Sequence, residues 1–153
     1  MEFLGLMEAF GKDVGIGALE PDFDRVCRVD IDGMRVSFLE MPQSGQLVTW
    51  AAVCEPPPDG REQLYQMLME AMFMGRETGG GAFSVDAETG SVYLHRFDAL
   101  QTMDLDSFKA MLEKFANVLE SWRRRVADFR PQTSDGPQGV AFGQFGMDGF
   151  LQV

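Results

Sequence analysis

Residues 61–75 read REQLYQMLMEAMFMG, a short polar start followed by an almost continuous apolar run. Its spacing predicts a helix whose apolar arc spans roughly 200°, about twice the stripe that one core face requires. Such a helix is either enclosed within its own domain or shared with a second copy of the chain. We favour a homodimer, because one short chain forms few layers that can cover both sides. The residues predicted for the dimer interface are Leu64, Tyr65, Leu68, Met69 and Met72.

Strand patterns flank this helix on both sides. Residues 27–31 and 34–38 alternate between apolar and polar around Asp32 and Gly33, a dipeptide typical of tight hairpins. Residues 46–54 carry apolar side chains of both parities, which indicates a central strand or one covered on both faces. A second hairpin is predicted around the turn at residues 87–90. These strands are expected to form one twisted antiparallel sheet.

Two further helices complete the predicted domain. Residues 2–14 show helical spacing of apolar side chains, and Asp104 precedes a long amphipathic stretch that ends before Pro131. The order is α-β-β-β-α-β-β-α, an α+β domain with helices packed on an antiparallel sheet. We assign residues 1–130 to this domain.

Residues 131–153 differ in composition from the domain. They are rich in Gly and Gln, contain no Lys or Arg, and include Phe142, Phe145 and Phe150. This composition predicts a flexible tail with an apolar end. One hypothesis is that the tail occupies an apolar groove of its own chain or of a neighbour until a partner displaces it. The alternative is an extension without that role.

Composition limits the function classes. The net charge of −11 disfavours nucleic acid and anionic membrane surfaces as partners, and there is no apolar run of about 18 residues. We therefore expect a cytoplasmic protein with a protein partner. Cys27, Cys54 and His95 are isolated in the sequence, so we expect reduced thiols, a structural histidine, no metal and no cofactor. Catalysis by these three residues is the least favoured alternative.

The order and spacing of several motifs resemble the class I type III secretion chaperones, the CesT/SycE-like family. The first helix ends in AFGK at residues 9–12, the central helix leads into TGGGAFSVD at residues 78–86, and ETGSVYL at residues 88–94 is similar to the last hairpin of the family. The final helix over residues 108–122 also resembles that of the family. Met72, Phe73 and Met74 stand where the family often has an Asn.

The resemblance implies a bacterial, non-enzymatic homodimer that binds the N-terminal segment of a secreted effector in an extended form. Components of the secretion apparatus are further candidate partners. The alternative is a regulatory module of the same fold that recognises a folded protein. We expect the effector-facing surface to combine exposed residues of the first helix and the first three strands. The alternative is that most of these residues belong to the core, and periodicity alone favours core positions for at least half of them. These residues are Phe3, Leu4, Met7, Val36, Phe38 and Trp50.

Overall fold

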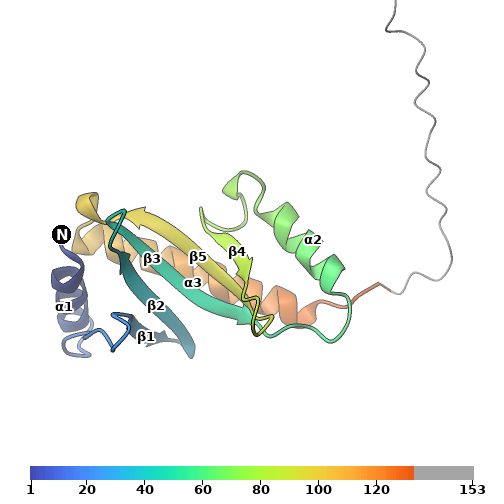
Figure 1. Ribbon diagram of the computed structural model, residues 1–153, viewed down its shortest axis with the longest axis horizontal. Coiled ribbons are helices and arrows are strands. Elements are labelled where there is room, and N and C mark those ends of the chain that lie inside the picture. The colour runs from blue at the N-terminus through green and yellow to red at the C-terminus, as the bar shows by residue number, and fades with distance from the viewer. Residues whose placement is uncertain (133–153) are drawn as a thin grey trace, which may run out of the picture.

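The computed structural model describes residues 1–132, so the prediction of a flexible tail lies almost entirely outside the described residues. The element order matches the predicted α-β-β-β-α-β-β-α and confirms the α+β class (Figure 1). The elements are α1 Phe3–Asp13, β1 Cys27–Ile31, β2 Met34–Met41, β3 Gln46–Cys54, α2 Arg61–Ala71, β4 Ala82–Val85, β5 Val92–Ala99 and α3 Leu105–Asp128, with short 3-10 turns η1 Phe73–Gly75 and η2 Leu100–Thr102.

The described strands form one twisted sheet in the order β1-β2-β3-β5-β4, with antiparallel pairing throughout. The central position predicted for residues 46–54 is confirmed, since β3 lies between β2 and β5. At the β1–β2 turn, Asp32 and Gly33 have φ angles of 49° and 78°. These left-handed values fit the turn that the Asp-Gly pair predicts.

Phe108 of α3 lies at the centre of the core and joins three elements. Its ring contacts the ring of Phe10 from α1 at a centroid distance of 5.1 Å and that of Phe38 from β2 at 5.3 Å. Both pairs meet edge to face, a favourable geometry for aromatic rings. The contacts hold α1 and α3 against the same face of the sheet.

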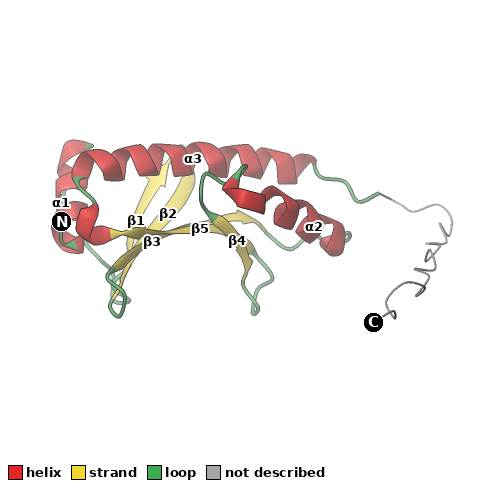
Figure 2. Cartoon of the chain, turned by 90° about the horizontal axis from the view of Figure 1, so that it is seen from above, coloured by secondary structure: helices red, strands yellow, loops and turns green. Residues whose placement is uncertain are grey.

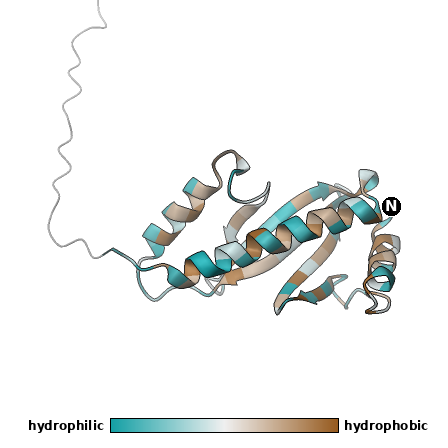
Figure 3. Ribbon diagram, turned by 180° about the vertical axis from the view of Figure 1, so that it is seen from behind, coloured by the Kyte–Doolittle hydropathy of each residue, from teal (hydrophilic) through white to brown (hydrophobic). Residues whose placement is uncertain are grey.

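α3 runs along that face for its whole length (Figures 2 and 3). It begins with a capping box, in which Ser107 N donates to the Asp104 carboxylate at 2.8 Å and Asp104 N donates to Ser107 Oγ at 2.9 Å. The capping box confirms the start predicted from Asp104. Towards its C-terminal end, Trp122 is fully buried and its Nε1 donates to the Glu77 carbonyl oxygen at 2.8 Å.

α2 is shorter than predicted. The helix ends at Ala71 rather than at Gly75, and the chain turns back through η1. Met74 and Gly75 both have left-handed backbone conformations, with φ angles of 57° and 66°. A right-handed helix cannot continue through two such residues.

Candidate functional site

α1 and α3 lie on one face of the sheet, and none of the described helices lies over the opposite face (Figure 2). That opposite face carries apolar side chains of β2, β3 and β5. Leu39 pairs with Val48, and Val48 pairs with Phe97, so these three side chains form a row across β2, β3 and β5. Trp50 lies two residues further along β3 on the same face, because side chains in a strand alternate between faces. Phe97 is exposed, and the other three are partly buried. We call Leu39, Val48, Trp50 and Phe97 the open face of the sheet.

The open face continues towards α1. Leu4 is 56% exposed, whereas Phe3, Leu6 and Met7 of the same helix are buried in the core. Together with Leu39 it lines a small hollow of about 60 Å³, whose other residues are Phe3, Pro21, Arg25 and Glu40. Apolar side chains of a helix and a sheet thus meet at one edge of the open face.

Of the six residues predicted to face an effector, the structure places Leu4 and Trp50 at this surface. The exposure expected for the other four is wrong, since each has 4% or less of its side chain accessible. In α1 the core stripe passes through Phe3 and Met7. In β2 the side chains of Val36 and Phe38 point to the helix-covered face, because the open face takes the opposite parity.

Sequence reasoning missed Leu39, Val48 and Phe97 as surface residues. The available signal was the second parity in β3, where Val48 and Trp50 alternate with the buried Leu47, Thr49 and Ala51. β2 and β5 also carry apolar side chains on both faces, as Phe38 and Leu39 in β2 and Leu94 and Phe97 in β5 show. Apolar residues on both faces of three adjacent strands indicate a sheet whose second face is also used.

A second exposed apolar surface lies at the C-terminal end of α2. Met69, Phe73 and Met74 are 66%, 64% and 78% exposed. We call these three residues the exposed end of α2. Arg76 contributes to it through its guanidinium group, which lies 5.7 Å from the centre of the Phe73 ring.

The residues predicted for a dimer interface divide into three groups. Leu64 and Leu68 are buried in the core of their own protomer, which corrects their expected exposure. Tyr65 is partly buried, and so is Met72, whose Sδ lies 3.0 Å from the backbone N of Phe83 in β4. Met69 is the member of the set that points away from the core. The cause is geometric, since α2 packs one stripe onto its own domain and leaves Met69 outside it.

Catalysis by Cys27, Cys54 and His95 is the least favoured alternative. Neither thiol is hydrogen-bonded to the imidazole of His95, which contacts Ser84 instead. Burial raises the pKa of the Cys27 thiol to about 11, and burial followed by the charge of Glu55 raises the pKa of Cys54. His95 lies on β5 with its Nδ1 3.2 Å from Ser84 Oγ, and burial lowers its pKa.

Among residues 1–132, no group of three His, Cys, Asp or Glu side chains is placed to hold a metal ion. None of the helices in this part of the chain has the length and apolar character needed to cross a membrane.

The comparison with protein families agrees with the geometry. The model of the Tir chaperone protein (CesT) family matches residues 5–123. The chain belongs to this family. Its members are chaperones rather than enzymes, as the sequence resemblance predicted. A protein of Chlamydia pneumoniae is 30% identical over 119 residues, which cover 76% of this chain and 90% of the relative.

Solved structures share the fold at lower identity. The complex of ExsC with ExsE contains a chain with a TM-score of 0.69 and 22% identity, covering 81% of this chain and 96% of that one. The HopA1–SchA chaperone–effector complex gives a TM-score of 0.64 at 15% identity, covering 78% and 91%. The Yersinia pestis type III secretion chaperone SycH, in complex with a fragment of YscM2, gives a TM-score of 0.59 at 18% identity. The match covers 78% of this chain and 98% of that one. The fold of this family member is thus that of type III secretion chaperones.

Proposed function

We propose that this protein is a type III secretion chaperone that acts as a homodimer in the bacterial cytoplasm. It holds the N-terminal segment of a secreted effector in an extended form and keeps that effector soluble and competent for export. Membership of the CesT family supports the proposal, and one of the similar structures is a chaperone–effector complex by its description. The function needs no cofactor, because binding alone keeps the segment from folding or aggregating.

The open face of the sheet is the observation that carries this proposal. An extended peptide places alternate side chains on one side, and a row of apolar residues across three strands offers matching contacts. Leu4 and the hollow beside it extend this surface to α1. We therefore assign effector contact to Leu4, Leu39, Val48, Trp50 and Phe97. Phe3, Met7, Val36 and Phe38 support the surface from the core.

The exposed end of α2 supports the homodimer. Large side chains more than half exposed at Met69, Phe73 and Met74 are typical of a surface that a partner covers. Methionine side chains are flexible and polarisable, which suits an adaptable contact between two copies. Tyr65 and Met72 border this surface and are assigned to the rim of the interface.

Capture of the protein from its own cells, followed by limited proteolysis, tests the proposed function. We expect a co-purifying protein whose N-terminal segment resists the protease only while it is bound. Capture of an intact folded partner without such a segment supports the regulatory module instead. Replacement of both cysteines by alanine is expected to leave the capture unchanged.

A further inference from the structure

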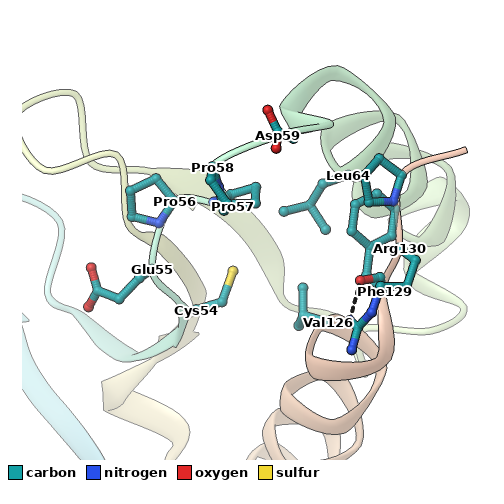
Figure 4. A pocket seen from close by; sticks show the side chains of 11 residues that line it. Cys54, Glu55, Pro56, Pro57, Pro58, Asp59, Leu64, Val126, Phe129 and Arg130 are labelled. Carbon is teal, nitrogen blue, oxygen red and sulfur yellow. Dashed lines mark hydrogen bonds between the residues drawn. The ribbon is translucent and has the colours of Figure 1, made fainter. Parts of the chain in front are cut away.

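An apolar cavity of about 420 Å³ lies between the loop that enters α2 and the C-terminal end of α3 (Figure 4). Its walls include Pro56 and Pro57 from the loop, Leu64 from α2, and Val126 and Phe129 from the end of α3. Cys54 lies at the end of β3 and directs its sulfur toward the same space. The cavity is large enough for an aromatic side chain, and proline rings offer flat apolar surfaces for such a ring.

The chain itself passes the mouth of this cavity after α3. Gln63 Nε2 donates to the Gln132 carbonyl oxygen at 3.1 Å, and Gln132 N donates to Gln63 Oε1 at 2.8 Å. Pro131 packs on Gly60, where an added Cβ would lie 2.5 Å from the Pro131 Cβ. These contacts fix residues 131 and 132 beside the cavity, so residues 133–153 start from its rim.

We propose that this cavity binds an aromatic side chain from residues 133–153 of the same chain, with Phe142 as the first candidate. Phe142 lies ten positions after Gln132, and an extended segment of that length spans at most about 35 Å, enough to fold back into the cavity. Residues 133–153 contain no Lys or Arg, so no strongly hydrated cation accompanies the ring.

Attachment at the rim favours this occupant over a free partner. A tethered group has an effective concentration in the millimolar range, so even a weak contact with one ring is populated. The clamp between Gln63 and Gln132 shortens the free part of the tether, because the chain is already held at the cavity. The inference does not depend on the proposed function, since it concerns a contact within one chain.

Cys54 provides a direct probe of the occupant. The rate at which iodoacetamide alkylates Cys54 is measured by peptide mass spectrometry in the full chain. It is compared with the rate in a variant that carries Phe142→Ser, Phe145→Ser and Phe150→Ser. Cys27 is completely buried and serves as the internal reference, so the readout is the ratio of the Cys54 rate to the Cys27 rate. Loss of folding exposes both thiols and does not imitate an effect confined to Cys54.

We expect the triple Phe→Ser variant to raise this ratio on the order of threefold or more, because the tethered ring no longer covers the thiol. A matched variant with Thr133→Ala, Ser134→Ala and Gln138→Ala is expected to leave it unchanged. Addition of a peptide of residues 138–153 to the Phe→Ser variant should lower the ratio again. If the variant is poorly folded, Phe142→Ser alone is measured, with the same direction expected.

Two results overturn the proposal. Equal ratios in the full chain and in the Phe→Ser variants mean that the aromatic side chains do not cover the cavity. A ratio for the full chain that falls as protein concentration rises means that another molecule occupies it.

Discussion

Val48 and Phe97 pair directly across β3 and β5. Both side chains lie on the face opposite the core, because Leu47 and Thr49, the neighbours of Val48 along β3, are buried on the core face. Leu39 extends the pair to β2. Removal of apolar surface from water is favourable. A row of apolar side chains in the middle of a sheet therefore stabilises a complex with a partner that covers it. The position of the row makes it the most direct target for testing effector binding.

Substitution of Val48 by Glu is expected to weaken binding of the effector segment by tenfold or more, corresponding to about 1.5–3 kcal/mol of lost apolar contact. Gln46→Glu is the matched control, because it adds the same charge to the same strand and the same face at a polar position. Titration monitored by tryptophan fluorescence measures the affinity, since Trp50 lies beside the row. Unchanged affinity in the Val48 variant, with folding intact, would remove the open face from the binding site.

Substitution of Met69 by Glu is expected to convert the homodimer to monomers without unfolding the domain. Met69 is 66% exposed in a single protomer, so its loss leaves the core intact, whereas a charge at the buried Leu68 would unfold it. Gln66→Glu places the same charge on an exposed polar position of α2 and should leave the dimer in place. Sedimentation equilibrium distinguishes the outcomes, and a Met69 variant that stays dimeric would contradict the proposed interface.

Two glycines of α1 are expected to respond in opposite directions to alanine. A Cβ at Gly11 would lie 2.0 Å from the carbonyl oxygen of Gly17, so Gly11→Ala forces the following loop away from the helix and is expected to destabilise the domain by more than about 1 kcal/mol. Gly5 has open space around it, and Gly5→Ala should stabilise by about 0.5–1 kcal/mol through helix propensity. Urea unfolding of both variants measures the difference. Equal effects would show that the loop does not pack on Gly11.

The capping box of α3 predicts a pH dependence of stability. The side-chain hydrogen bond with Ser107, and then the backbone bond from the same residue, hold the pKa of the Asp104 carboxyl below its ordinary value of 3.8. Because the folded-state pKa is the lower one, the stabilisation is complete above the ordinary value and is lost as pH falls through the folded-state value. Asp104→Asn keeps a capping oxygen but cannot titrate, so its stability should fall less steeply below about pH 4. Identical acid profiles of the two proteins in urea unfolding would contradict this role.

The sequence predicted the fold well because local signals and the global pattern agreed. The Asp32-Gly33 turn, the Asp104 cap and the two parities of β3 each specified an element that the structure contains. The end of α2 was mispredicted because Met74, a good helix former, takes a left-handed conformation next to Gly75. The spacing of apolar side chains gives no signal for a left-handed backbone conformation.

Site residues were harder to predict than elements. A helical or strand period identifies which side chains share a face, but not which face the rest of the chain covers. Val36 and Phe38 are therefore predicted to be exposed, although they are buried. The partly exposed apolar residue of β2 is Leu39, which follows Phe38 and lies on the opposite face. Leu64 and Leu68 were assigned to a partner because the apolar arc of α2 is wide, whereas the structure divides the arc between the core and Met69.

The mass of the captured complex under native conditions, measured after limited proteolysis, tests the central claim most directly. We predict two copies of this chain together with one protected segment from the N-terminus of another protein. One copy bound to an intact folded partner, with no protected segment, would contradict both the homodimer and the chaperone function.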